Sequence, residues 1–379
     1  MARNLTNKTL VELSATEVGS KIRTGEISSV ELVKACLERI EQVDGDVQAW
    51  AHLDPEYALE QAQILDAQRQ AGGPVGPLHG IPVGIKDVFD TRSLPTENGT
   101  VLDSGRRPMQ DSKVISLLKE AGAVIMGKTV TTELAVFGPG KTRNPHNFDH
   151  TPGGSSSGSC AAVAAHMVPL AIGTQTNGSV IRPASYCGIF GFKPTHGLIP
   201  RTGVLKSSPP LDTVGTFARS IEDIALLTEA LVAFDPGDKH TRAQARPSLC
   251  ETALTEPPMT PVVAFAKTAV WDQADDETRE AFEELVGLLG DDCHELELSE
   301  PFDHAIDMHR NIMNADLAKN YAGYYERGKD KLTDKLCQMI EFGQKVSAVD
   351  YNTAIDGQEL LNTGLNLVFE HYDFIITPA

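Results

Sequence analysis

The chain has 379 residues, a formal net charge of −19 at pH 7 and an apolar fraction of 41%. This apolar fraction is high enough to build a substantial hydrophobic core, so the composition excludes a disordered chain. The negative charge argues against nucleic acid or an anionic membrane surface as the main partner, since both are themselves negatively charged.

Three further features bear on where the protein works. The first residues, MARNLTNKTLVEL, lack the apolar segment of a secretory signal, and no apolar run is long enough to cross a bilayer. The six cysteines are scattered without a CxxC pair, which favours reduced thiols over a disulfide framework or a zinc site. We therefore expect a cytoplasmic protein that is not bound to a membrane and that uses neither a metal nor another cofactor.

The N-terminal part of the chain, about residues 1–70, is predicted to be helical. Ser28 begins an S-x-x-E pattern, the spacing of a capping box, and apolar residues follow it at helical intervals. A further helix is expected from about Pro55 to Gln70. After a Gly/Pro-rich connection, residues 81–89 are apolar enough to form a buried strand, and this strand contains Lys86.

Short helices and strands alternate through the middle of the chain. A polar, turn-rich loop over 91–111 precedes a predicted helix over 114–121 and a predicted strand over 123–126. Two Gly/Ser-rich turns follow, separated by a small-residue helix over 160–167 and a short apolar strand over 169–172. Because this alternation favours a sheet with helices on both faces, we predict an α/β fold around a central mixed β-sheet.

The last part of the chain is predicted to resume the sheet after an acidic, Pro-containing boundary over 235–261. The predicted elements around this boundary are a helix over 220–234, a strand over 262–266, a helix over 276–289, a strand over 294–298 and mostly helical residues over 302–367. We therefore predict a single domain over 1–379 with its core over about 75–235. Because the final YDFIITPA is typical of a core strand but stops at its own end, we expect the chain to be truncated after Ala379.

Lys86 is the first candidate for chemistry. Burial in an apolar strand makes a charged amine costly and lowers its pKa, and a neutral amine can act as a general base. The structural alternative is an ion pair with a nearby carboxylate such as Asp87. Because such pairs are common at strand ends, this segment taken alone favours the structural alternative.

The first Gly/Ser turn, TPGGSSSGSC, contains Ser155 and Ser156. Its glycines allow backbone angles that other residues avoid, so it suits a flexible loop, an anion site at a helix N-terminus or a nucleophile. A phosphate loop is excluded because no GK[ST] follows. The GxSxG pattern around Ser156 matches a nucleophile elbow, but an elbow directly follows a core strand, and the preceding NPHNFDHTPG is not typical of one.

The second turn, GTQTNGS, follows an apolar segment and contains Ser179. Such a turn can point successive backbone N–H groups at one spot, as an oxyanion hole requires, or it can be an ordinary strand-to-helix turn. Competing nucleophile arrangements have less support. Cys187 lies in an apolar run and is expected to pack in the core. No spacing singles out a Ser–His pair among the nearby histidines, which are His79, His146, His150, His166 and His196.

Taken together, these segments resemble the amidase signature hydrolases. The segments, in chain order, are GPLHGIPVGIKDVFDT, GKTVTTELA, TPGGSSSGSCAAVAA, GTQTNGSVIRPASYCGIFGFKPT and LDTVGTFARSIED. The resemblance implies the amidase-signature fold and a Ser–cis-Ser–Lys triad, in which Ser179 is the acylated nucleophile, Ser155 the bridging serine and Lys86 the base. The further site residues that it implies are the oxyanion-hole amides of Thr176, Asn177, Gly178 and Ser179, with Thr131 and Gly154 at the substrate.

The reaction implied by this resemblance is hydrolysis of the C–N acyl bond of a small-molecule amide or carbamate, and by extension an ester, through an acyl-enzyme. The family places the acyl side of the substrate near residues 131–137 and the amine side near residues 197–210. Two alternatives stay open: a glutaminase-type subunit of a tRNA-dependent amidotransferase complex, and a catalytically inactive scaffold. The oligomeric state is left open.

The chain departs from the family pattern at four positions. Ser157 and Asn177 stand where glycines are common, and Gln175 replaces an acid. Arg182 lies three residues after the proposed nucleophile instead of two. We expect Gln175 and Arg182 to belong to one altered contact, and the Asn177 side chain to narrow the acyl site if its N–H faces the substrate.

Overall fold

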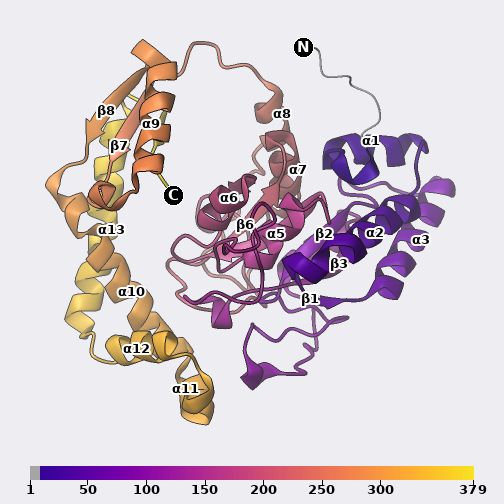
Figure 1. Cartoon of the computed structure of the whole chain (residues 1–379), viewed down its shortest axis with the longest axis horizontal. Coiled ribbons are helices and arrows are strands. Elements are labelled where there is room, and N and C mark those ends of the chain that lie inside the picture. Colours follow the sequence, from indigo (N-terminus) through magenta and orange to yellow (C-terminus); the bar gives the residue numbers. More distant parts are fainter. Residues whose placement is uncertain (1–8) are drawn as a thin grey trace. The chain divides into compact units, whose positions relative to one another are not determined.

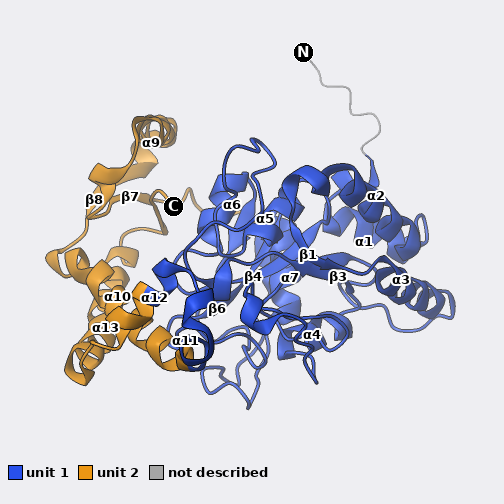
Figure 2. Cartoon of the chain, turned by 60° about the horizontal axis from the view of Figure 1, so that its bottom comes forward, with its two compact units in different colours: residues 1–254, 323–337 blue, residues 255–322, 338–379 orange. Residues whose placement is uncertain are grey.

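The computed structural model describes residues 9–379. The expected absence of a secretory signal and the start of the predicted helical N-terminal part concern residues 1–8 for the most part, which lie outside the described residues. The chain groups into two compact units, residues 1–254 with 323–337 and residues 255–322 with 338–379 (Figure 2). The single domain expected over the whole chain stays a prediction.

Six strands form a mixed sheet in the first unit, in the order β1–β3–β2–β4–β6–β5. Figure 1 labels β1, β2, β3 and β6 of this sheet. The strands are β1 (Trp50–Leu53), β2 (Pro82–Lys86), β3 (Val124–Thr129), β4 (Leu170–Gln175), β5 (Phe190–Phe192) and β6 (Thr213–Ala218). The pairs of β2 with β3 and with β4 are parallel, and the other three pairs are antiparallel. The predicted α/β class with a mixed central sheet is confirmed.

Helices cover both faces of this sheet. They are α1 (Ala15–Thr24), α2 (Ser29–Val47), α3 (Pro55–Gln70), α4 (Lys113–Glu120), α5 (Ser157–Ala164), α6 (Ile181–Cys187), α7 (Ile221–Leu231) and α8 (Leu249–Leu254), with short 3-10 turns at Leu10–Glu12, Val101–Asp103 and Glu133–Ala135. Helices α5 and α6 pack closely on one face. A Cβ atom added at Gly173 of β4 would meet Ser156 at the start of α5, and one added at Gly191 of β5 would meet Ala184 of α6. On the opposite face, a hydrogen bond of 2.8 Å joins the hydroxyls of Thr216 on β6 and Thr228 on α7.

The register of the parallel strands brings two predicted site segments together. Val83 pairs with Leu170 and Ile85 with Ile172, so β2 and β4 end side by side. Both run in the same direction, and the residues that follow them meet at one edge of the sheet. Lys86 therefore lies at the same edge as the turn that follows β4.

Local sequence signals explain most of the N-terminal helices. Ser28 caps α2 by accepting a hydrogen bond from the N–H of Glu31 at 3.1 Å, which confirms the predicted capping box.

The prediction of a helical N-terminal part is wrong at Trp50–Leu53, which forms edge strand β1. This segment has too few residues to show a period, and antiparallel pairing with β3 decides its conformation. The small-residue helix expected over 160–167 begins earlier, at Ser157.

The second unit has its own three-stranded parallel sheet, in the order β8–β7–β9. Its strands are β7 (Val263–Lys267), β8 (Cys293–Glu297) and β9 (Phe374–Ile376), and its helices are α9 (Asp276–Leu289), α10 (Ala305–Asn320) and α13 (Ala348–Phe369). Helices α11 (Ala322–Gly328) and α12 (Asp334–Gly343) include residues of both units, because the chain passes from the second unit to the first at residue 323 and returns at residue 338. The expectation that these strands resume the central sheet is wrong, because β8 and β9 occupy both edges of β7.

Two features are absent from residues 9–379. No helix there has both the length and the apolar character needed to cross a membrane. No group of three or more His, Cys, Asp or Glu side chains in the same residues is arranged to hold a metal ion.

Candidate active site

Lys86 is the last residue of β2, and its side chain is fully buried. Its Nζ donates hydrogen bonds to Ser155 Oγ at 2.7 Å and to Thr174 Oγ1 at 2.9 Å. Burial lowers the pKa of the Lys86 amine to about 7, although the negative charge of Asp212 opposes this effect. A substantial fraction of Lys86 is therefore neutral near pH 7 and able to accept a proton from Ser155.

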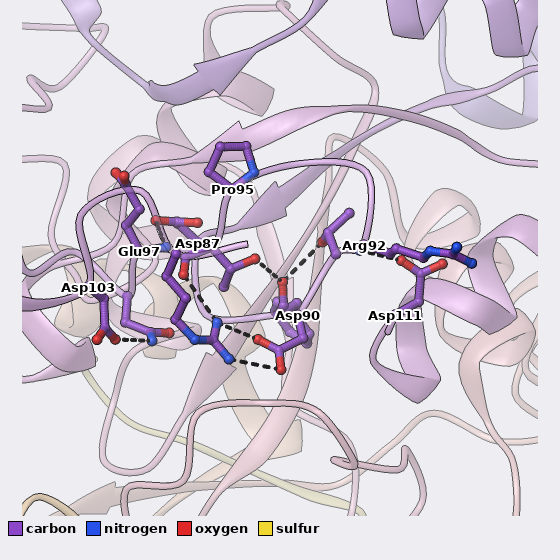
Figure 3. A network of polar contacts seen from close by, with 12 residues as sticks. Asp87, Asp90, Arg92, Pro95, Glu97, Asp103 and Asp111 are labelled. Atoms are coloured by element: carbon purple, nitrogen blue, oxygen red, sulfur yellow. Dashed lines mark hydrogen bonds and ion pairs between the residues drawn. The ribbon is translucent and has the colours of Figure 1, made fainter. Parts of the chain in front are cut away.

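A second buried lysine holds the carboxylate that follows Lys86 in sequence. Lys128 Nζ on β3 lies 3.0 Å from Asp87 Oδ1 and donates a hydrogen bond to Thr96 Oγ1 at 2.7 Å. The N–H of Glu97 donates to the other Asp87 oxygen at 3.1 Å, within the polar network of Figure 3. Asp87 is thus held by Lys128, and the structural alternative that paired Asp87 with Lys86 is wrong.

This buried ion pair yields a stability prediction. Removing one partner of such a pair leaves the other charge buried and uncompensated. We expect Asp87→Ala to lower the free energy of unfolding by about 3–5 kcal/mol, measured by urea unfolding followed by circular dichroism. Lys119→Ala breaks the partly exposed pair with Asp111 and should cost less than about 1 kcal/mol. Equal losses in the two variants would contradict the prediction.

Ser155 lies in the turn before α5, with 3% of its surface exposed. The peptide bond Gly154–Ser155 is cis. The N–H of Thr132 donates to the Ser155 carbonyl at 3.2 Å, and Arg182 Nε donates to the Gly154 carbonyl at 3.3 Å. These contacts and the hydrogen bond from Lys86 hold the Ser155 hydroxyl at the edge of the sheet.

Ser156, the serine that the GxSxG pattern selects, makes structural hydrogen bonds to the backbone of β4. Its Oγ donates to the Thr174 carbonyl at 3.3 Å and accepts from the Thr174 N–H at 3.4 Å. Described residues 141–155 contain one isolated bridge and turns but no strand, so the core strand that an elbow requires is absent from them. Ser156 instead connects the start of α5 to β4.

Ser179 lies in the turn between β4 and α6 and is 8% exposed. Gln175 Oε1 accepts hydrogen bonds from the N–H groups of the two residues after Ser179, at 2.8 and 3.0 Å. Within residues 9–379, the N–H groups of Asn177, Gly178 and Ser179 donate to no other protein group. These three amides are therefore available to an oxyanion, and the oxyanion role expected of the Thr176 amide stays a prediction.

The departures at Gln175 and Arg182 do not share one contact. Gln175 bonds the start of α6, where it satisfies N–H groups that have no partner within the helix. Arg182 bonds the Gly154 carbonyl, and its guanidinium carbon lies 5.6 Å from the centre of the Phe137 ring. The expectation of a single altered contact is therefore wrong, because the two side chains act on different segments.

The remaining predicted positions surround these turns. Ser157 is buried and donates to the Val130 carbonyl at 3.3 Å, and the side chain of Asn177 is exposed. Thr131 is buried, with its hydroxyl donating to the Thr132 carbonyl at 3.1 Å. Thr131 therefore lies next to the residue whose N–H bonds Ser155, and its place at the substrate stays a prediction.

The histidines and Cys187 make contacts of the fold. Four ring hydrogen bonds go to backbone carbonyls: His79 to Leu65, His146 to Cys187, His166 to Val11 and His196 to Pro209. Cys187 is fully buried. In the described part of the chain, no hydrogen bond joins Cys187 or any of the five histidines considered above to Ser155 or Ser179.

Sequence reasoning missed two polar residues beside Lys86. Thr174 had no distinguishing signal, whereas Asp212 stands in the quoted LDTVG segment as an acid directly before a strand. Loss of hydration raises the pKa of the Asp212 carboxyl to about 6, although hydrogen bonds to it act in the opposite direction. Both residues line a cavity of about 400 Å³ with parts of the 201–209 and 236–240 segments.

Comparison with known proteins adds family relationships to this geometry. A family model described as Amidase matches residues 31–379. A curated protein from Thermobifida fusca, named as one of the subunits of glutamyl-tRNA(Gln) amidotransferase, is 45% identical over 252 residues, which are 64% of this chain and 50% of that protein. The match thus spans about half the length of this relative.

Two solved structures are similar over most of the chain. The first is described as an unexpected vestigial protein complex that reveals the evolutionary origins of an s-triazine catabolic enzyme. It has a TM-score of 0.87 and 26% identity, and the match covers 95% of this chain and 80% of that one. The second is the native peptide amidase from Stenotrophomonas maltophilia, with a TM-score of 0.78, 26% identity and coverage of 90% and 78%.

Proposed function

The chain belongs to the amidase family as an amidase-signature hydrolase, and from this premise we propose that it cleaves a C–N acyl bond through an acyl-enzyme on Ser179. The observation that carries the proposal is the 2.7 Å hydrogen bond between the fully buried Lys86 amine and the Ser155 hydroxyl. A buried amine with a pKa lowered to about 7 is a general base that a surface lysine is not.

The proposed reaction is a proton relay followed by hydrolysis. Neutral Lys86 accepts the proton of the Ser155 hydroxyl, and Ser155 takes the proton of Ser179 as Ser179 Oγ attacks the carbonyl carbon. The backbone amides of residues 177–179 stabilise the oxyanion of the tetrahedral intermediate. Return of the proton through Ser155 protonates the leaving nitrogen, and the C–N bond breaks. Water then attacks the ester on Ser179 by the same relay and releases the acid.

For the substrate, we propose the side-chain amide of glutamine, hydrolysed by a glutaminase-type subunit of an amidotransferase complex. The 45% identity with the glutamyl-tRNA(Gln) amidotransferase protein supports this choice over an unrelated small amide. The second candidate is a free-standing amidase for small amides or carbamates. The peptide amidase likeness supports it, because that likeness covers a larger share of both chains. Carbamate and ester substrates and a cytoplasmic location stay predictions.

Ammonia release separates the two candidates. The glutaminase candidate predicts release from glutamine that rises when the partner subunits of an amidotransferase are added. The free-standing amidase predicts turnover of aryl amides, aliphatic amides or carbamates by the chain alone, without an effect of partner subunits. Glutamine hydrolysis that is absent with and without partners would contradict the first candidate.

The pH dependence follows from Lys86. Its pKa in the folded chain is about 7, far below the ordinary value of 10.5, and only its neutral form accepts a proton. As pH falls below about 7, Lys86 becomes protonated, so the rate of Ser179 labelling by a fluorophosphonate should fall roughly tenfold per pH unit. The measurement is the labelling rate between pH 5 and 9, and a rate that stays flat over this range would contradict the role of Lys86.

A further inference from the structure

Asp212 lies directly before β6, at the edge of the sheet where Lys86 and the turn after β4 meet. In the β4–β6 ladder Gln175 pairs with Thr213, which places Asp212 opposite Thr176. The Thr176 hydroxyl donates a hydrogen bond to Asp212 Oδ1. Thr176 is the first residue of the turn that carries the oxyanion amides, so this bond links the carboxylate directly to that turn.

Backbone groups fix the other oxygen of the carboxylate. Asp212 Oδ2 accepts hydrogen bonds of 2.9 Å from both N–H groups of the 207–208 segment. Arg201 is paired elsewhere: its Nε and Nη2 donate to Asp238 at 2.9 and 3.0 Å, and it reaches Asp212 only at the backbone carbonyl. The Asp212 carboxylate is therefore held in place while its negative charge acts on Lys86.

We propose that Asp212 is a positioning residue of the hydrolytic site. Through Thr176 it orients the oxyanion turn, and its carboxylate stabilises the protonated form of Lys86 that arises when Ser155 gives up its proton. Both effects act through groups of the protein itself. The inference rests on the function proposed above for Ser179, because it assigns a role to Asp212 within that proton relay.

Several charges face Asp212 from the elements around it. Lys86 on β2 and Arg201 on the loop before β6 interact with its charge, and the other charged or titratable residues that line the same cavity are Lys206, Asp238, Lys239 and His240. Asp212 raises the pKa of Lys86 against the effect of burial. Without this charge, burial lowers the pKa of Lys86 further. Because Lys86 works in its neutral form, the loss of rate on acidification should then begin at a lower pH.

The test is the rate at which a fluorophosphonate labels Ser179 of the full chain, measured from pH 5 to 9 for the parent and for Asp212→Asn. In the variant, we expect the midpoint pH for the loss of labelling rate on acidification to be lower by on the order of one pH unit. We also expect the plateau rate to drop about tenfold, because the single oxygen of the Asn amide cannot accept from both Thr176 and the 207–208 segment, which weakens the anchor of the oxyanion turn. Asp212→Ser is a second uncharged variant, and circular dichroism identifies the variants that fold.

Thr176 variants separate the two roles of Asp212. Thr176→Val removes the hydrogen bond but keeps the charge, so we expect a lower plateau with the midpoint moved by no more than a few tenths of a unit. Thr176→Ser keeps a hydroxyl and should restore the plateau. If Thr176→Val had the plateau rate of the parent, the positioning role would be overturned. This holds whether or not the Asp212 variants fold.

The outcomes also distinguish this inference from the proposed function. Folded Asp212→Asn or Asp212→Ser with the midpoint and plateau of the parent would show that Asp212 serves the fold alone. A parent chain that is not labelled at Ser179 would instead refute the proposed function itself.

Discussion

Ser179→Ala is expected to abolish both amide turnover and labelling by a fluorophosphonate. The hydroxyl of Ser179 is the group that forms the acyl bond in the proposed reaction, and loss of such a nucleophile lowers kcat by on the order of 10⁶-fold. The fold should be unaffected, since in the described residues the Ser179 hydroxyl makes no hydrogen bond that the substitution would break. Turnover, labelling and thermal unfolding of the variant check these expectations together.

Ser156→Ala is the matched control, because it removes a hydroxyl from the neighbouring turn. Ser156 bonds both backbone groups of Thr174, so its loss should cost roughly 1–2 kcal/mol of stability while most activity is kept. If Ser156→Ala were inactive and Ser179→Ala active, the nucleophile elbow would be right and the triad wrong.

Lys86→Met is expected to lower kcat/KM by about 10²–10⁴-fold, the contribution typical of a general base. The residual rate should no longer fall as pH drops through 7, because the titrating amine is gone. Thermal stability should be equal to or higher than that of the parent, since methionine fills a similar volume without an amine that must be removed from water. The measurements are kcat/KM between pH 6 and 9 and the midpoint of thermal unfolding.

Lys128→Met is the control for this substitution, because Lys128 is an equally buried lysine on the neighbouring strand. It leaves Asp87 without its partner, so we expect a large loss of stability. The fraction of this variant that remains folded should lose rate on acidification in the same way as the parent. Activity of Lys86→Met that matched the parent from pH 6 to 9 would instead make Lys86 a structural residue.

Strong local patterns made much of the fold predictable. The capping signal at Ser28, the apolar strand around Lys86 and the alternation of elements in the middle third each depend on neighbouring residues. The two serine turns were found in the same way, because Gly/Ser segments between core elements stand out. The second turn lies at the same edge as Lys86 because of the parallel register of β2 and β4, and the first turn reaches Lys86 through the hydrogen bond to Ser155, neither of which the residues alone showed.

Features decided by distant parts of the chain were missed. Edge strand β1 is short and becomes a strand through its pairing with β3. The sequence places the strands after residue 262 in the central sheet because apolar strands carry no mark of their partners, but within residues 9–379 these strands pair only with one another. Thr174 and Asp212 escaped notice for the same reason, since their importance comes from contacts across β4 and β6.

The most direct test of the proposed triad is to map the fluorophosphonate adduct on the unmodified chain by mass spectrometry after digestion. We predict one adduct, on Ser179, that forms at pH 8 and much more slowly at pH 5, where Lys86 is protonated. An adduct on Ser156, or none at pH 8, would contradict the assignment of Ser179, Ser155 and Lys86.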